Sequence, residues 1–256
     1  MLEKTIDQLR STTEDHKKSY AEFIDIAAHD LDAPLRRLSI LIERLTSKYK
    51  NITENDAQTQ EWLTRIDKCL IHMRSLIDGL SELSGANYST QEDHTCNIKN
   101  QVNEILQELE PEIKEKNAVI SQLHLPAIQG SEIQLRQLFK NLIENSLRFC
   151  KKNISPEISI SSLRLNEEEK KLHGLDPGKE YFKISISDNG IGFKQEYAEK
   201  IFQPFIRLNA RSAFEGNGLG LAICKRIVDN HKGILYAEGI ENSGTRFTLI
   251  LPETRN

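Results

Sequence analysis

Residues 131–151 read SEIQLRQLFKNLIENSLRFCK, and this stretch decides the fold of the C-terminal part of the chain. Its apolar residues recur at intervals of three and four, which predicts a long amphipathic helix. Asn141, Asn145 and Arg148 lie at positions i, i+4 and i+7 and therefore share one helical face. Two amides and a guanidinium suit a magnesium polyphosphate, because amide oxygens coordinate metal ions and guanidinium binds phosphate. Taken alone, such residues more often form a solvated polar face.

The segments around this helix alternate between helical and extended patterns. We expect strands at residues 118–125, 157–163, 181–187, 233–238 and 245–251. We expect further helices at residues 100–116 and 219–230. Residues 166–179 are charged and rich in turn-forming residues, which predicts an exposed hairpin insert between two strands. This order of elements favours an α+β sandwich with helices on one face of a mixed sheet.

A second motif, Ser187-Asp-Asn-Gly-Ile-Gly-Phe193, follows one of the expected strands. Gly190 and Gly192 permit a turn whose backbone approaches a flat ligand closely. The carboxylate of Asp188 can accept a hydrogen bond from an exocyclic amine such as N6 of adenine. By itself, the motif is also what an ordinary Asp-Asn-Gly turn between two elements looks like.

A third motif, Glu215-Gly-Asn-Gly-Leu-Gly-Leu221, leads into a predicted helix. Its glycines, at 216, 218 and 220, are typical of loops in which backbone N–H groups and a helix N-terminus face a phosphate. The spacing excludes a Walker P-loop, which needs Lys followed by Ser or Thr, and it does not fit a dinucleotide fingerprint. A flexible linker remains the alternative for this motif alone.

These three motifs, together with Phe202-Gln-Pro-Phe205 and Gly244-Thr-Arg-Phe247, resemble in their order the catalytic domain of histidine kinases. That family shares its nucleotide-binding fold with gyrase, mismatch-repair and heat-shock chaperone ATPases. The resemblance covers residues 94–252 and implies an ATP-binding catalytic domain at 94–256. In the ATPases of this fold, a glutamate occupies the position of Asn141 and activates water. An amide cannot act as a general base, so Asn141 favours phosphoryl transfer over hydrolysis.

The resemblance also implies a role for each site residue. Asn145 would bind Mg²⁺, Asn141 and Arg148 would lie beside the phosphates of ATP, and Phe149 would line the base pocket. Asp188 would bind the adenine amine in a pocket shaped by Gly190 and Gly192. Residues 203–218 would form a mobile lid over ATP, with Arg207 as a phosphate contact. The remaining positions expected to bind ATP are Gly216, Gly218, Gly220 and Thr245.

The N-terminal part, residues 1–88, has the periodicity of two helices. One heptad seam comprises Ile24, Ala27, Leu31, Pro34, Leu38, Leu41 and Leu45. After a polar stretch at 48–60, a second seam comprises Trp62, Ile66, Cys69, Met73, Leu76, Leu80 and Leu83. Because one helical hairpin buries too little surface, we expect two copies to dimerise into a four-helix bundle. Residues 1–20 are expected to form an incoming coiled-coil helix.

His29, within Ala-Ala-His-Asp-Leu-Asp-Ala-Pro-Leu-Arg36, is the candidate phosphoacceptor. If Ile24 is an a position, His29 is at f and points away from the bundle. Asp30 can accept the imidazole N–H and raise the nucleophilicity of the other ring nitrogen. The stretch resembles the phosphoacceptor box of phytochrome-like histidine kinases, which implies transfer of phosphate from His29 to a response-regulator receiver domain. Many relatives carry Thr or Asn where this chain has Ala33, so we expect weak or no phosphatase activity by that route.

Composition narrows the class of protein. The chain has 256 residues, 38% hydrophobic and 28% charged, as in soluble globular proteins, and its net charge of −4 argues against a nucleic-acid partner. No apolar run approaches the roughly 18 residues that span a bilayer, so we expect a cytoplasmic protein whose sensor domain or protein lies outside this chain. The four widely spaced cysteines predict buried reduced thiols.

Three functions remain open at this point: an autophosphorylating kinase, an ATP-hydrolysing machine of the same nucleotide fold, and a non-enzymatic scaffold. Asn141 and the His29 hairpin argue against the second, and the presence of both His29 and the glycines argues against the third. The pattern cannot decide between phosphorylation within and between subunits.

Overall fold

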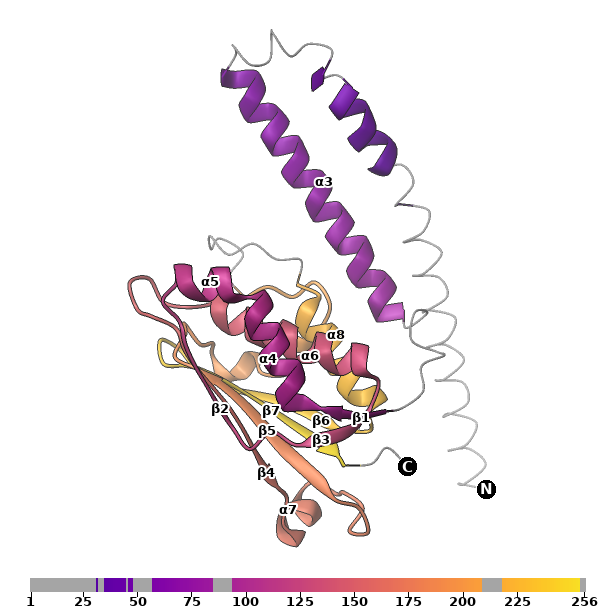
Figure 1. Ribbon diagram of the computed structural model, residues 1–256, viewed down its shortest axis with the longest axis vertical. Coiled ribbons are helices and arrows are strands. Elements are labelled where there is room, and N and C mark those ends of the chain that lie inside the picture. Colours follow the sequence, from indigo (N-terminus) through magenta and orange to yellow (C-terminus); the bar gives the residue numbers. More distant parts are fainter. Residues whose placement is uncertain are drawn as a thin grey trace. The chain divides into compact units, whose positions relative to one another are not determined.

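The computed structural model describes residues 31, 35–44, 46–47, 57–84, 94–208 and 218–253, and the chain divides into two compact units, residues 1–90 and 91–256. Figure 1 shows helices alone in the described part of the first unit and a layered α+β arrangement in the second. The candidate phosphoacceptor His29, its neighbours Asp30 and Ala33, and Gly216 lie outside the described residues.

A five-stranded mixed sheet in the order β2-β4-β5-β7-β6 forms one layer of the C-terminal unit. The strands are β2 (Val119–Leu123), β4 (Glu157–Arg164), β5 (Tyr181–Asp188), β6 (Ile234–Ile240) and β7 (Gly244–Pro252). β2 runs parallel to β4, and the other neighbours are antiparallel. The central strands pair apolar residues on one face, such as Ile186 with both Ile160 and Phe247. The opposite face is polar there, with Ser185 between Ser161 and Thr248.

The second layer consists of helices α4 (Ile98–Glu108), α6 (Glu132–Arg148) and α8 (Gly220–Asn230), which cover one face of the sheet (Figure 1). α6 supplies the centre of the core, because Leu135, Leu138, Phe139 and Leu142 are fully buried. Its first turn is capped by Ser131, whose side chain accepts a hydrogen bond from the N–H of Gln134. The predicted α+β sandwich is confirmed for this unit.

One predicted helix is wrong in detail. Residues 100–116 form two helices, α4 and α5 (Glu110–Glu115), which meet at Leu109. Pro111 explains the break, because it has no N–H to donate and is tolerated only in a first helical turn. Two four-residue strands were not predicted, β1 (His94–Asn97) and β3 (Ala127–Gly130), which pair with each other in an antiparallel ribbon.

The insert between β4 and β5 is not the exposed hairpin that its composition predicts. It contains the short helix α7 (Glu167–Leu172), which begins with a capping box between Asn166 and Glu169. Leu175 packs on a cluster formed by Leu165, Tyr181 and Ile250. Ile250 alternates with the inward-facing Leu249 and Leu251 along β7, so the insert covers part of the polar face of the sheet.

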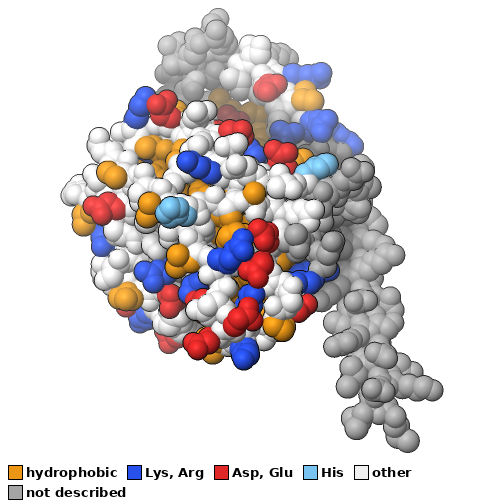
Figure 2. Space-filling view, turned by 60° about the horizontal axis from the view of Figure 1, so that its bottom comes forward, with side chains coloured by type: hydrophobic (Ala, Val, Ile, Leu, Met, Phe, Trp, Pro, Cys, Tyr) orange, Lys and Arg blue, Asp and Glu red, His pale blue; other side chains and the backbone are white. Residues whose placement is uncertain are grey.

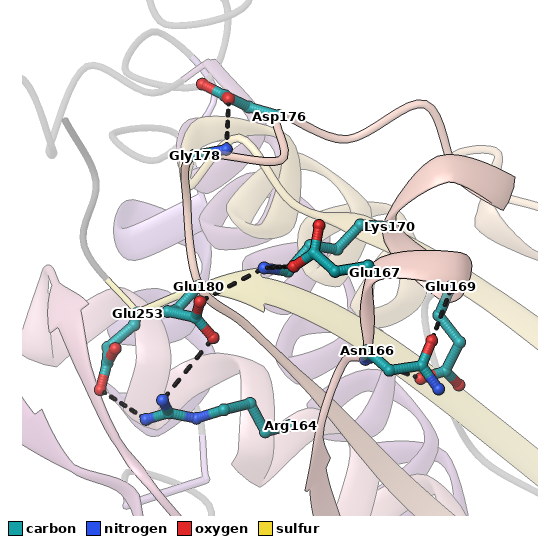
Figure 3. A network of polar contacts seen from close by, with 9 residues as sticks. All are labelled: Arg164, Asn166, Glu167, Glu169, Lys170, Asp176, Gly178, Glu180 and Glu253. Atoms are coloured by element: carbon teal, nitrogen blue, oxygen red, sulfur yellow. Dashed lines mark hydrogen bonds and ion pairs between the residues drawn. The ribbon is translucent and has the colours of Figure 1, made fainter.

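Ion pairs fix this insert to the ends of the strands (Figure 3). The Nζ of Lys170 is buried and lies 2.8 Å from Glu167 and 3.3 Å from Glu180. Glu180 also pairs with Arg164, which pairs in turn with Glu253. The face presented in Figure 2 accordingly shows acidic and basic side chains interspersed rather than separated by sign.

In the first unit, residues 31, 35–44 and 46–47 are helical, and α3 (Ala57–Ser84) follows. α3 begins before the end of the polar stretch 48–60, so that stretch is not a turn throughout. Leu35, Leu70 and Ile77 form a buried cluster against which Ile42 packs. Of the predicted seam residues that the structure describes, Leu76 and Leu80 are half-buried. Six large apolar ones are exposed in a single copy of the chain: Leu31, Leu38, Leu41, Trp62, Ile66 and Met73.

Candidate nucleotide site

The polar face of α6 lies against the beginning of α8. The Nδ2 of Asn141 donates a hydrogen bond to the carbonyl oxygen of Gly220, at 3.4 Å. Deeper along the same contact, the thiol of Cys224 donates to the carbonyl of Leu138. Burial raises the pKa of Cys224 to about 12, against an opposing hydrogen bond with Asn141, so the thiol stays protonated. α8 therefore begins beside the predicted phosphate-binding face.

Asn145, Arg148 and Phe149 follow on α6 and are all half-buried. The amide of Asn145 makes no side-chain hydrogen bond within the described part of the chain, which leaves both of its polar atoms available to a ligand. Glu144 lies on the neighbouring face, and burial raises its pKa, while Lys140 and Arg148 act in the opposite direction. No motif in the sequence indicated Glu144 as a site residue.

Asp188, the last residue of β5, is the centre of the second cluster. Its Oδ1 accepts hydrogen bonds from the backbone N–H groups of Gly190, at 2.8 Å, and Thr245, at 3.2 Å. Its Oδ2 accepts one from the Oγ of Ser146, at 3.3 Å. Burial raises the pKa of Asp188 above its ordinary value, and these three donors together with Lys151 oppose the shift. The structure thus brings together Asp188 and Thr245, two residues that the sequence placed at separate motifs.

The glycines of the second motif allow its loop to pack closely. A Cβ on Gly190 would lie 2.5 Å from the carbonyl oxygen of Phe149. Gly192 has φ +61°, and a Cβ there would lie 2.0 Å from the carbonyl oxygen of Ile240. The N–H of Ile191 donates to the carbonyl of Phe149, at 2.9 Å. The loop is therefore fixed to the C-terminal end of α6, where Phe149 follows the last helical residue.

Two further polar residues of this cluster were missed by the sequence analysis. Ser146 lies on the buried side of α6, where a serine in an amphipathic pattern gives no signal of a partner 42 residues away. Asn189 accepts from the N–H of Glu157 and donates to the carbonyl of Ser155, which connects the motif to the start of β4. An Asn that follows Asp in a turn could have indicated this role.

The predicted lid is described only at its two ends. The N–H of Phe205 donates to the carbonyl oxygen of Gly218, at 3.0 Å, so the ends of the segment meet. Arg207 is exposed, and residues 209–217, with Gly216, lie outside the described residues. Gly218 has φ +72°, and Gly220 is the first residue of α8. Of the predicted glycines, Gly218 therefore lies at the end of the predicted lid, and Gly220 lies at the start of α8.

Other expectations have simpler outcomes. Cys96 and Cys224 are buried as predicted, but Cys69 is exposed on α3, and all four cysteines are free. Within the described ranges, no helix is long and apolar enough to cross a membrane. No group of three or more His, Cys, Asp or Glu side chains that could hold a metal occurs among the described residues, whereas the predicted magnesium ligand is an amide.

Comparison with known proteins decides the family. Residues 130–255 match the family of histidine kinase-, DNA gyrase B- and HSP90-like ATPases. The chain is 30% identical over 249 residues to cyanobacterial phytochrome A of Nostoc sp. (strain PCC 7120), across 96% of this chain and 30% of that protein. It is 28% identical to the adaptive-response sensory kinase SasA of Microcystis aeruginosa, across 91% of this chain and 59% of that kinase. The chain belongs to the sensor histidine kinases.

A solved structure extends the comparison to the fold of this histidine kinase. The crystal structure of full-length ShkA in complex with AMPPNP superimposes with a TM-score of 0.67 at 20% identity, across 91% of this chain and 46% of that one. At this identity, the likeness shows a shared fold. The chain spans about a third of the length of the phytochromes that it matches, and 59% of the length of SasA from Microcystis aeruginosa.

Proposed function

We propose that this histidine kinase binds Mg·ATP in its C-terminal unit, transfers the γ-phosphoryl group to His29, and passes it on to an aspartate of a response regulator. The observation that carries the proposal is that α6 contacts two of the motifs: Ser146 bonds to Asp188, and Asn141 bonds to Gly220 at the beginning of α8. The relatives named as phytochromes and sensory kinases support the same assignment. The structure of ShkA holds AMPPNP, an analogue of the proposed nucleotide.

The adenine end of the proposed site is built around Asp188. Its two oxygens receive three hydrogen bonds from the protein, and an ionised carboxylate has about four acceptor positions. One position therefore remains for the exocyclic amine of adenine. Phe149, which follows α6, and the loop of Gly190 and Gly192 would flank the base.

The phosphate end lies along α6 and α8. α8 is 11 residues long and begins at Gly220, and the preceding Leu219 has no side-chain acceptor to cap the first turn. A helix N-terminus of this kind favours an anion. Because Nδ2 of Asn141 is directed at Gly220, its Oδ1 faces away from that contact. We propose that Arg148 and Arg207 supply cations for the phosphate oxygens, and that Gly216, Gly218 and Gly220 also contact the phosphates.

Asn145 is the proposed magnesium ligand. Its half-buried amide has no partner within the described part of the chain, and carboxamide oxygens are suitable ligands for hard cations. Magnesium ions hold few protein ligands and several phosphate oxygens, so one amide with the ATP phosphates is a sufficient donor set. When bound, the ion would neutralise charge that develops on the phosphates.

In the proposed reaction, a ring nitrogen of His29 attacks the γ-phosphorus in line. A nitrogen–phosphorus bond forms as the bond to the bridging oxygen breaks, and ADP leaves with the electron pair. Asp30 would orient the ring and accept its other N–H. Because Asn141 offers an amide rather than a carboxylate, the site lacks the general base that water attack requires at that position. Transfer to His29 is therefore favoured over hydrolysis.

We propose that the first unit forms a homodimer. Its uncovered apolar side chains recur with helical spacing on both helices, and Trp62 is 53% exposed in one copy. Joining two such hairpins would bury both stripes in a four-helix bundle. The signal that controls the kinase would enter through residues 1–20 from an upstream sensor domain or protein. Arg36, Arg37 and Ile40 are exposed, and we propose that a receiver domain contacts this part of the first helix.

Incubation with γ-labelled ATP and Mg²⁺ tests this proposal against its alternatives. We expect label on the protein and little free phosphate. Rapid release of free phosphate without labelled protein would instead indicate an ATP-hydrolysing machine. Nucleotide binding with neither product would indicate a scaffold. Addition of a receiver domain should move the label to it, and with Ala33 near the acceptor we expect slow loss of phosphate from the receiver.

A further inference from the structure

Ser146 contacts Asp188, the proposed adenine-binding carboxylate, from the buried side of α6. In sequence it lies between the two predicted ligands Asn145 and Arg148, but its side chain is on the buried side of α6 and it is 2% exposed. Its Oγ lies 3.3 Å from Oδ2 of Asp188 and 3.2 Å from the carbonyl oxygen of Leu142. The single hydroxyl proton therefore has two acceptors, and an ionised carboxylate is the stronger one.

The two oxygens of Asp188 are not equivalent. Oδ1 already accepts two backbone N–H groups, from Gly190 and Thr245. Oδ2 receives only the hydroxyl of Ser146, among the residues that the structure describes. Since each oxygen has about two acceptor positions, Oδ2 is the atom with a position left for a ligand. The hydroxyl fixes the orientation of the atom that the exocyclic amine would meet.

From this geometry, we infer that Ser146 is a positioning residue for adenine recognition: its hydroxyl holds Oδ2 of Asp188 in place for the N6 amine. The inference rests on the proposed function, because it concerns the same nucleotide site. Ser146 itself does not contact the nucleotide in this account. It acts through Asp188 alone.

A consequence for ionisation supports the assignment. Burial raises the pKa of Asp188, and the hydrogen bond from Ser146 is among the contacts that oppose the shift. Without that hydroxyl, the carboxyl would take up a proton at higher pH. A protonated Asp188 has lost the negative charge that attracts the amine hydrogen, so nucleotide affinity would fall in the same pH range.

The test compares the full chain with Ser146→Ala and Ser146→Thr by calorimetric titration. Alanine removes the hydroxyl and is the best helix former, so the variant keeps α6 folded, which a thermal melt checks. Threonine retains a hydroxyl. Each protein is titrated with ADP and with the 6-deamino analogue, purine riboside 5′-diphosphate, over a range of pH.

We expect Ser146→Ala to bind ADP about three- to tenfold more weakly, which is less than the loss of a direct hydrogen bond to a charged group costs, because Ser146 acts only through Asp188. Its binding of the deamino analogue should change little, so that the preference for ADP shrinks. The acid limb of ADP binding should move to higher pH, and Ser146→Thr should restore both properties. If Ser146 had a purely structural role, Ser146→Ala would weaken the binding of both ligands equally and leave the pH dependence of ADP binding unchanged.

Two different results would overturn the role of Ser146, and they can be distinguished from each other. If the unaltered chain binds ADP but Ser146→Ala shows the same preference for ADP and the same acid limb, the role of Ser146 is overturned while the nucleotide site stands. If the unaltered chain binds neither diphosphate, the proposed function is overturned, and this inference falls with it.

Discussion

The two units differ in how much of their apolar surface one copy of the chain buries. The C-terminal unit buries one side of α6, caps its first turn with Ser131, and packs Leu175 of the insert on a buried cluster. The helical unit buries Leu35, Leu70 and Ile77 and leaves a longer stripe of leucine, isoleucine, methionine and tryptophan exposed. We therefore expect the C-terminal unit to fold alone, and we propose that the helical unit needs a second copy of itself to cover its stripe. Under the proposed function, nucleotide binding and dimerisation belong to units that differ in how much apolar surface one copy of the chain buries.

The largest expected effect is the loss of the proposed dimer of the helical unit. In Ile66→Asp combined with Met73→Asp, two carboxylates would be buried in the dimer seam without partners. Each costs several kcal/mol, so we expect the dimer dissociation constant to rise more than about a thousandfold. Ile71→Asp is the matched control, because Ile71 is also exposed on α3 but lies outside the stripe. The thermal unfolding of the C-terminal unit should not change.

Trp62 provides the measurement, because it is the one tryptophan of the chain and lies in the stripe. On dilution of the unaltered protein, its fluorescence should shift to the red as the dimer, followed by light scattering, dissociates. The double variant should show the red-shifted emission at every concentration. If the unaltered protein were monomeric at all concentrations, the proposed dimer would be contradicted.

A smaller effect is expected in the C-terminal unit, where one substitution should weaken ADP binding without unfolding the unit. Asp188→Asn presents an amide where adenine requires an acceptor. Losing a hydrogen bond to a charged group weakens ADP binding by roughly 10- to 100-fold. Calorimetric titration measures this loss. The fold should survive, because an uncharged group is easier to bury.

The pH dependence of this variant has a definite sign. The folded-state pKa of Asp188 is raised by burial. Its favourable contribution to the free energy of unfolding is therefore present below the ordinary carboxyl pKa and is lost as pH rises through the raised value. Without nucleotide, Asp188→Asn should gain stability relative to the unaltered chain as pH increases over that window. A fall in the free energy of unfolding of Asp188→Asn relative to the unaltered chain over that window would contradict the assigned shift.

His231 tests whether buried contacts stabilise the C-terminal unit, because it joins the end of α8 to the start of α6. Its Nε2 accepts from the N–H of Ser131, at 3.2 Å, and its Nδ1 donates to the carbonyl of Ile227, at 2.8 Å. Removing a buried acceptor costs about 1–3 kcal/mol, so His231→Leu should lower the melting temperature of this unit. His173→Leu, in the insert, is the control and should lower it less. Equal melting temperatures for the two variants would show that the buried contact is dispensable.

The smallest effect concerns the insert. Asn166→Ala removes the cap of α7, which costs about 1 kcal/mol. We expect faster hydrogen exchange in residues 166–172 and no change in ADP affinity. Unchanged exchange there would show that packing of Leu175 and the ion pairs of Lys170 hold the insert without its cap.

What the sequence predicts follows from the range of the interactions involved. α6 is predictable because its apolar period extends over 17 residues. β1 and β3 are four residues each and exist only because they pair with each other across α4, α5 and β2, so local periodicity gives no signal. The break at Leu109 was available from Pro111. The burial of Lys170 was not available, because its partner Glu180 follows a turn whose geometry composition does not define.

The same distinction holds in the site. Asp188, Gly190 and Gly192 are adjacent in sequence, so their motif indicates them together. That Thr245 donates to the same carboxylate as Ser146 depends on strand register and on the packing of α6 against β5. Residues of the motifs could be predicted individually, but the hydrogen bonds that connect the motifs could not.

The most direct test of the central claim is the position and chemistry of the phosphate on the chain. After incubation with γ-labelled ATP and Mg²⁺, we predict a label on the protein that is lost in acid, kept in base, and absent from His29→Gln. Label that survives acid, or that persists in His29→Gln at the level of the unaltered chain, would contradict the account.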